Sequence, residues 1–280
     1  MKKMKKGKAS NVLLIIIFLA GLSLLLYPSI ANYWNSVYST HAITVYSERT
    51  KQLSEKEYTE IWEAARLYNG NVISGSEEHY LSDSDRLTYE NLLNLDGNGI
   101  MGYIEIPTID VTLPVYHGTS DVVLQTAVGH VDWTSLPVGG LSTHCVLSGH
   151  RGLPSAKLFT NLDKLIEGDR FMLRILDEVL TYEVDQILIV EPQNVEPLKI
   201  EENKDYCTLV TCTPYGINTH RLLVRGHRVE NEEEAASVRI ISDAMQIEPL
   251  IVSSIIAVPL LMIAIILMIT TGKQRNRKRR

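Results

Sequence analysis

The chain has 280 residues, of which 33 are acidic and 27 basic, and a formal charge of −6. Its two ends hold eleven of the basic residues and none of the acidic ones, so 16 basic and 33 acidic residues remain between them, a formal charge of −17. Such an acidic body argues against nucleic acid or anionic lipid as a partner, and agrees with a protein substrate that brings its own lysines. The length between the ends is enough for one well-buried core.

Two uncharged apolar runs, 12–30 and 249–272, each have about the 20 residues that a helix needs to cross a bilayer. Each adjoins a basic tail, 1–11 at the start and 273–280 at the end. Basic flanks of membrane spans stay in the cytoplasm, so both termini are predicted to be cytoplasmic and the domain between them extracellular. The first run also resembles a signal peptide, but no clear small-residue cleavage site follows Pro28, which favours a retained anchor.

Residues 31–100 are predicted to form a helical lead-in and a lid-like region. Helix-like patterning with alternating charges runs from Ser36 to Leu67, and a short helix is expected over Leu87–Leu95 after a polar stretch. Asp96-Gly97-Asn98-Gly99 then ends the helix. This pair of glycines follows a helix and lacks a third glycine, which excludes a dinucleotide-binding loop.

Residues 101–229 consist of short β-type runs separated by turns, which is the pattern of a closed β-barrel. The expected strands are Met101–Ile106, Val111–Val115, Cys145–Ser148, Arg170–Leu176, Leu180–Val190, Tyr206–Cys212 and Arg221–Val229. A short helix is expected at Ala156–Leu165, and 230–248 reads as an acidic linker to the second span. The predicted fold class is therefore mostly β: a closed barrel with short helices, an N-terminal helical lead-in and a transmembrane helix at each end.

A thiol and a guanidinium are predicted to meet at one end of this barrel. The run Thr208–Cys212 ends in the thiol, and Arg221 opens the next run nine residues later. The residues between them, Thr213–Thr219, are mostly turn-formers, so the two runs are expected to pair as an antiparallel hairpin. A cysteine becomes a nucleophile when the pKa of its thiol is lowered or when its proton is shared with a base. A guanidinium beside it can stabilise an oxyanion. His150 is the best candidate for the acid and base that such a pair requires.

Other residues compete for these roles. His144 also lies close to an apolar run, and Arg225 shares a strand face with Arg221 because their separation is even. The nine-residue offset from Cys212 favours Arg221, which can face the thiol across the hairpin. The remaining histidines are expected to be surface or packing residues: His41, His79, His117, His130, His220 and His227.

The chain has two further cysteines, Cys145 and Cys207. Cys207 and Cys212 are five residues apart in an extended run, hence on opposite faces and on the order of 16 Å apart, too far for a disulfide. A pairing of Cys145 with Cys207 stays open, although the sequence favours two small buried residues. No Cys-x2-Cys or His-x3-His spacing exists, so no metal site and no cofactor are expected.

The amino-acid sequence of the hairpin, together with several upstream segments, resembles that of the sortases, and in detail that of the pilus-assembling class C sortases of Gram-positive bacteria. The matching segments are Thr208–Gly216, Asn218–Gly226, Gly102–Pro107, Leu113–Thr119 and Thr134–Gly140. They span about 130 residues, roughly Met101 to Val229. The resemblance implies a sortase-type barrel and an acyl-transfer enzyme.

The implied reaction starts when Cys212 attacks the carbonyl after the Thr of a Leu-Pro-x-Thr-Gly-like sorting signal and forms a thioester. A lysine amine of a pilin subunit would then resolve this thioester. His150 is implied as the acid and base and Arg221 as the oxyanion donor, with Thr211 and Thr213 as substrate contacts.

In class C sortases, a lid with an Asp-Pro-aromatic motif usually covers the site. This chain has only Leu81–Arg86 there, with Asp83 and Asp85 as lid candidates and no aromatic residue, so an open site is expected.

Three alternatives remain open. A housekeeping sortase would attach surface proteins to peptidoglycan, and an exported cysteine protease would resolve the thioester with water. A membrane-tethered binding module would use the thiol only structurally. The second span, the lead-in and the hairpin favour a class C sortase with pilin subunits as partners.

Overall fold

The computed structural model describes residues 4–71 and 83–231. The described residues fall into two units, one of residues 4–30 and the other of residues 31–71 and 83–231. In the first unit, the described part is the apolar beginning of helix α1 (Met4–Lys51). From Leu13 on, α1 is the one described helix that is long and apolar enough to cross a membrane. The predicted second span, 249–272, lies outside the described residues.

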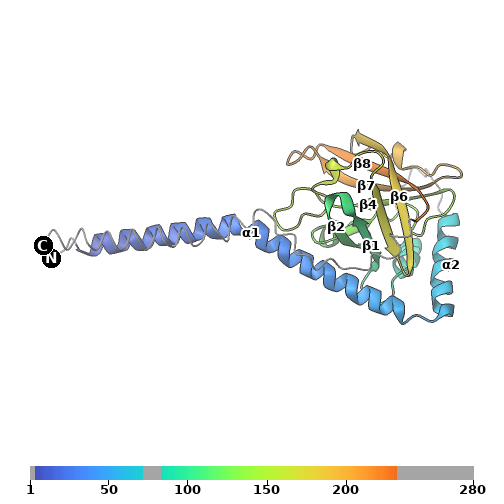
Figure 1. Cartoon of the computed structure of the whole chain (residues 1–280), viewed down its shortest axis with the longest axis horizontal. Coiled ribbons are helices and arrows are strands. Elements are labelled where there is room, and N and C mark those ends of the chain that lie inside the picture. The colour runs from blue at the N-terminus through green and yellow to red at the C-terminus, as the bar shows by residue number, and fades with distance from the viewer. Residues whose placement is uncertain (1–3, 72–82, 232–280) are drawn as a thin grey trace. The chain divides into compact units, whose positions relative to one another are not determined.

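The second unit is built around a closed eight-stranded barrel (Figure 1). The strands are β1 (Ile100–Ile106), β2 (Val111–His117), β3 (Val128–His130), β4 (Thr143–Ser148), β5 (Arg170–Ile175), β6 (Glu178–Val190), β7 (Asp205–Thr213) and β8 (His220–Arg228). Their order around the barrel is β1-β2-β3-β4-β7-β8-β6-β5. The β2–β3 and β4–β7 pairs are parallel and the others antiparallel. The predicted closed barrel is thus confirmed, and only β3, three residues long, was missed.

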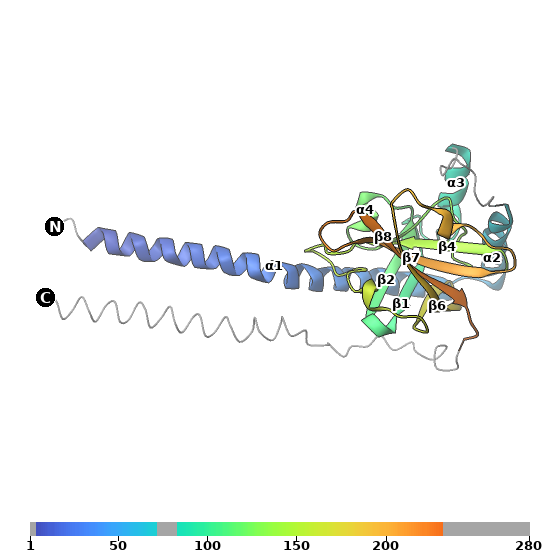
Figure 2. The ribbon, with the colours of Figure 1, turned by 90° about the horizontal axis from the view of Figure 1, so that it is seen from above.

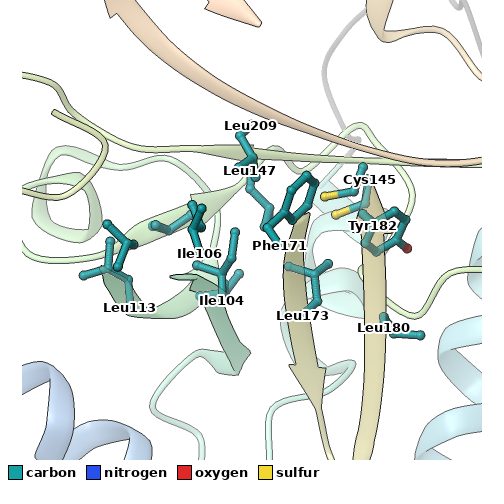
Figure 3. Close-up of a cluster of buried hydrophobic side chains, with 14 of the residues drawn as sticks. Ile104, Ile106, Leu113, Cys145, Leu147, Phe171, Leu173, Leu180, Tyr182 and Leu209 are labelled. Atoms are coloured by element: carbon teal, nitrogen blue, oxygen red, sulfur yellow. The ribbon is translucent and has the colours of Figure 1, made fainter. Parts of the chain in front are cut away.

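The core fills the barrel because alternate residues of each strand are apolar and face inward. Figure 3 shows such inward side chains from several strands, among them Ile104, Leu147, Phe171 and Leu209. All four are fully buried. The opposite faces of β4, β7, β8 and β6 carry a second, smaller cluster, in which Val146, Leu198 and Leu223 are buried against Trp133 and Val210, among others. Thus the strands that end near Cys212 are covered on both faces.

Three helices precede the barrel in the chain and pack on it. They are α1, α2 (Glu55–Asn71) and α3 (Asp83–Asn91). Tyr46 of α1 is buried, and its hydroxyl donates to Met101 O (2.9 Å) and accepts from Leu176 N (2.7 Å). The side-chain amide of Asn69 on α2 donates from Nδ2 to Leu136 O (3.0 Å), and its Oδ1 accepts from Leu136 N (2.7 Å). The lead-in is therefore part of the folded unit.

The break between α1 and α2 has a local cause. Ser54 and Glu57 form a reciprocal cap, in which Ser54 N donates to the Glu57 carboxylate (2.9 Å) and Glu57 N donates to Ser54 Oγ (3.3 Å). This cap starts a new helix at Glu55, so the helical stretch expected from Ser36 to Leu67 is two helices. The short helix expected at Leu87–Leu95 is α3, displaced by four residues toward the N-terminus.

The prediction of a helix at Ala156–Leu165 is wrong. This segment is a series of turns with a single 3-10 turn, η2, at Leu162–Lys164. Leu158 adopts a left-handed conformation (φ 37°) that no α-helix contains. Tertiary packing explains the difference, because Leu158 and Phe159 are both buried and Phe159 N donates to His150 O (3.1 Å). The other short helical elements are α4 (Asp121–Leu124), η1 (Pro107–Ile109) and η3 (Glu196–Leu198).

Candidate active site

Cys212 and Arg221 face each other across the β7–β8 hairpin. In the antiparallel register, Cys212 is the direct partner of Arg221, with Thr213 opposite His220 as the last pair before the loop. Directly opposed residues project from the same face of the sheet, so the thiol and the guanidinium start from adjacent positions about 5 Å apart. This is the juxtaposition that the nine-residue offset predicts.

His150 follows β4, which lies parallel to β7 on the other side. The last pair in that ladder is Ser148 with Val210, and Gly149 N continues it by donating to Val210 O (3.1 Å). Extending the register by two residues sets His150 beside Cys212. Continued past the end of β4 in this way, the ladder predicts a row of His150, Cys212 and Arg221 with the thiol in the middle.

Two contacts hold the backbone around His150. The buried hydroxyl of Thr211 donates to Gly149 O (2.7 Å), and His150 O accepts from Phe159 N (3.1 Å). A Cβ atom on Gly149 would lie 2.7 Å from the Phe159 ring, so this position has no room for a side chain. The chain after β4 is thus fixed from both sides, which limits where the imidazole can lie.

Arg221 and Arg225 differ in their partners. Arg225 makes two bonds to the Asp185 carboxylate (3.0 and 3.1 Å) and one to Glu201 (3.2 Å), and lies 4.1 Å above the Tyr206 ring. Among the described residues, Arg221 donates only to backbone carbonyls, of Asn218 (3.3 Å) and His220 (3.1 Å). The guanidinium beside the thiol therefore keeps donors for another ligand, whereas that of Arg225 is engaged by acidic partners.

His144 also has a structural environment. It is buried, its Nε2 lies 2.7 Å from Thr208 Oγ1, and its Nδ1 lies 2.9 Å from Lys199 O. Burial lowers its pKa below the usual value. A neutral ring with both nitrogens occupied suits a packing role. His117 and His130 are likewise held inside, in ring contact with Tyr89.

The two threonines that flank Cys212 are both buried. Thr211 uses its hydroxyl on Gly149 O, and Thr213 Oγ1 accepts from Arg151 Nη1 (3.4 Å). Their predicted contact with substrate stays a prediction, while the bonds that they make connect β7 to the chain after β4.

Arg151 is a site neighbour that sequence reasoning missed. Its side chain is only 10% exposed, pairs with Asp163 and lies 5.9 Å from the Tyr215 ring. Its Nε is buried and has no partner among the described residues. The sequence signal that could have found it is an arginine directly after the predicted catalytic histidine, in His150-Arg151-Gly152.

The lid candidates Asp83 and Asp85 lie on α3, whose described contacts are at the end of β3. Arg86 pairs with Asp132 (3.6 Å), and the Tyr89 hydroxyl lies 2.9 Å from His130 Nδ1. His150 lies beyond the other end of β3, because Ser148 is opposite Gly129. Figure 2 shows α3 beside α2, well away from α4. Within 4–71 and 83–231, no three side chains of the metal-ligating types cluster.

Comparison with known proteins agrees with this geometry. A family model described as the sortase domain matches residues 104–229. Sortase D of Bacillus subtilis is 30% identical over 131 residues, 46% of this chain and 63% of that protein, so the chain spans less than two thirds of its length. Sortase A of Streptococcus agalactiae is 28% identical over 207 residues, 72% of this chain and 77% of the relative.

Solved structures match at higher sequence identity. Sortase C1 of Streptococcus agalactiae is 52% identical with a TM-score of 0.67, covering 69% of this chain and 100% of that chain. Sortase C of Streptococcus pneumoniae is 44% identical with a TM-score of 0.62, covering 68% and 97%. With a matched domain model and near-complete coverage of these neighbours, the chain belongs to the sortase family of cysteine transpeptidases, and the solved structures that it resembles are class C sortases.

Proposed function

We propose that the protein is a membrane-anchored class C sortase. It cleaves a Leu-Pro-x-Thr-Gly-like signal after Thr and joins the acyl group to a lysine amine of a pilin subunit. The observation that carries the proposal is the pairing of Cys212 with Arg221 across the β7–β8 hairpin, with His150 two residues beyond the last β4–β7 pair. The structure of sortase C from Streptococcus pneumoniae, which is described as giving insight into pilin substrate specificity, supports the choice of substrate class.

In the first half of the reaction, the Cys212 thiolate attacks the carbonyl carbon of the signal's Thr. Negative charge develops on the carbonyl oxygen, and the Arg221 guanidinium stabilises it with planar N–H donors. His150 gives a proton to the departing glycine amine as the C–N bond breaks. The product is a thioester on Cys212 and a free C-terminal fragment.

In the second half, His150 takes a proton from the incoming lysine ammonium. The neutral amine attacks the thioester carbonyl, the C–S bond breaks as Cys212 leaves as the thiolate, and the second proton of the attacking nitrogen passes to solvent as the amide forms. A lysine acceptor agrees with the acidic body of the chain, which attracts cationic groups. A thioester reacts readily with amines yet survives long enough to meet a slow second substrate, which suits polymer assembly.

The proposed location is the cell membrane, with the barrel outside and both termini in the cytoplasm. The apolar part of α1 supports an anchor at the start of the chain. The second span rests on the uncharged run 249–272 and its basic flank 273–280.

The site is proposed to be open, because no Asp-Pro-aromatic motif precedes the barrel and the contacts of α3 lie at the other end of β3. Replacing Asp83 and Asp85 together by Ala should leave the rate of peptide cleavage within about twofold. A large increase would mean that one of these carboxylates holds a lid over the thiol.

The direct test uses the full chain in mild detergent with a sorting-signal peptide, with and without a lysine-bearing pilin peptide. A transpeptidase gives an amide product that depends on the acceptor and a thioester on Cys212 detectable by mass spectrometry. Hydrolysis alone would favour a protease, transfer only to peptidoglycan amines a housekeeping sortase, and no thioester a binding module. His220→Ala, beside Arg221 but outside the row, is the matched control for Cys212→Ala, His150→Ala and Arg221→Ala, each of which should abolish joining.

A further inference from the structure

Cys145 and Cys207 lie directly opposite each other in the parallel ladder of β4 and β7. Both are buried, 2% and 0% exposed, and the structure contains them as free thiols. They face the barrel interior, where Figure 3 shows Cys145 close to Tyr182 and Phe171. The proposed reaction uses neither thiol.

Their spacing suits a covalent bond. Neighbouring strands lie about 4.8 Å apart, and the Cα atoms of disulfide-bonded cysteines usually lie about 4.4–6.8 Å apart. A bond between them needs no change of strand register, because Cys145 is already the register partner of Cys207.

The third cysteine is not a competing partner. Cys212 is five residues beyond Cys207 on the same strand, so it projects from the opposite face and lies on the order of 16 Å away. The barrel therefore holds one matched pair of thiols inside and one thiol outside.

We propose that Cys145 and Cys207 form a disulfide that cross-links β4 to β7 in the exported protein. The oxidant is a small-molecule disulfide. The thiolate of one cysteine attacks it to form a mixed disulfide and releases one thiol; the thiolate of the other cysteine then attacks the protein sulfur of that mixed disulfide and releases the second. Two thiol protons of the protein end on the two released thiols. The extracellular setting comes from the proposed topology, and disulfides persist in such compartments.

The surroundings make the two thiols unequal. Burial acts to raise the pKa of Cys145, but hydrogen bonds with Cys207 and His130 lower it overall. Burial and the neighbouring Cys145 raise the pKa of Cys207 well above the usual value. Because both are shielded from solvent, exchange takes place while the barrel is still open during folding, and the closed barrel then protects the bond from reductants.

The cross-link has a consequence for the proposed site. Cys145 is five residues before His150, and Cys207 is five residues before Cys212. The bond therefore fixes the register of β4, which leads to His150, against β7, which carries Cys212. It also closes a loop of about 60 residues, which reduces the entropy of the unfolded chain. For a domain of this size, that effect corresponds to a rise in Tm on the order of 10 °C.

The test is the redox state of the full chain, extracted from membranes in mild detergent with an alkylating reagent present from lysis onward. In a Cys212→Ala background, denaturation should expose no thiol that reacts, and mass spectrometry should find the Cys145 and Cys207 peptides joined with the loss of two hydrogens. Reduction before alkylation should label both. Complete labelling of both cysteines without reduction, or a disulfide that contains Cys212 in the wild type, overturns the proposal.

A second measurement separates the bond from ordinary packing. In thermal unfolding, samples refolded with glutathione disulfide should have a Tm on the order of 10 °C higher than samples refolded with a reductant. Cys145→Val and Cys207→Val keep an apolar side chain of similar volume, and each should abolish the difference. A difference that survives in either variant, or none in the wild type, contradicts the cross-link, whatever the transpeptidase assay gives.

Discussion

At the scale of single residues, Arg221 and Arg225 provide a matched pair on one face of β8. Arg221→Lys replaces a planar set of donors by a point charge beside Cys212, and we expect kcat/KM for a sorting-signal peptide to fall on the order of 100-fold. Arg225→Lys removes the pair of hydrogen bonds from the guanidinium to the Asp185 carboxylate, so we expect a loss of about 1–3 kcal/mol in the free energy of unfolding with little change in kcat/KM. Steady-state kinetics and urea unfolding of both variants check this. The assignment fails if the two kinetic results are interchanged.

Thr211 offers a second residue-scale test, because its hydroxyl donates to Gly149 O from a buried position. Thr211→Val leaves that carbonyl without a partner and should cost about 1–3 kcal/mol of stability. It should also lower kcat more than it changes KM, since His150 is the next residue. Thr211→Ser keeps the hydroxyl and should restore both values. If Val and Ser behave alike, the hydroxyl does not position the histidine.

The sequence alone was enough to pair Cys212 with Arg221 but not to place His150 beside them. The offset of Cys212 and Arg221 follows from one hairpin, so local turn chemistry was enough to pair them. His150 needs the parallel pairing of β4 with β7, a contact across some 60 residues that no local pattern encodes. Resemblance to a family selected His150 from eight histidines. The contacts of His144 give a physical reason to assign it a packing role, which the periodicity of the sequence could not supply.

At the scale of elements, the end of β4 depends on the loop that follows it. Gly149→Ala would bring a Cβ atom to 2.7 Å from the Phe159 ring, so we expect a loss of about 1–3 kcal/mol and a drop in activity as the His150 backbone shifts. Phe159→Leu in the same chain makes room for the methyl group. A double-mutant cycle, measured by thermal unfolding and peptide cleavage, should give a favourable coupling energy. Additive losses would mean that the two residues do not pack as described.

Elements were predictable where their own residues determine them. Seven strands carry alternating or continuous apolar runs, whereas β3 has three residues, one of them glycine, too few for a periodic signal. The segment 156–165 is rich in apolar residues at helical spacing, but these serve to bury Leu158 and Phe159 against the barrel. Ser54 to Glu57 is a capping-box sequence, so the start of α2 could have been found.

At the scale of the whole molecule, the lead-in helices and the barrel share one core. Tyr46, Ala65 and Tyr89 come from α1, α2 and α3 and are all buried. The sequence indicated amphipathic helices but not the face of the barrel that they cover, since that depends on the order of the strands. Removing the lead-in would therefore unfold part of the core as well as any lid, which is why single substitutions on α3 test the lid better than truncation does.

The stability of the whole unit should depend on pH through His144. Burial holds its pKa in the folded state below the usual 6.5. Between the two pKa values, the unfolded chain binds a proton that the folded chain does not, so the free energy of unfolding falls as the pH drops below about 6.5. Above that pH the imidazole is neutral in both states and the contribution is fully present. The loss approaches about 1.4 kcal/mol for each pH unit until the folded pKa is reached.

Urea unfolding of the full chain in detergent, measured at several pH values between about 7.5 and 5, gives this slope. His144→Gln cannot take up the proton, so its slope should be smaller than that of the wild type, although the variant should be less stable at neutral pH because the bonds to Thr208 and Lys199 are altered. His220→Gln, at a half-buried position at the start of β8, is the control and should keep the wild-type slope. Equal slopes for the wild type and His144→Gln would show that proton uptake at this buried ring does not govern the acid sensitivity of the fold.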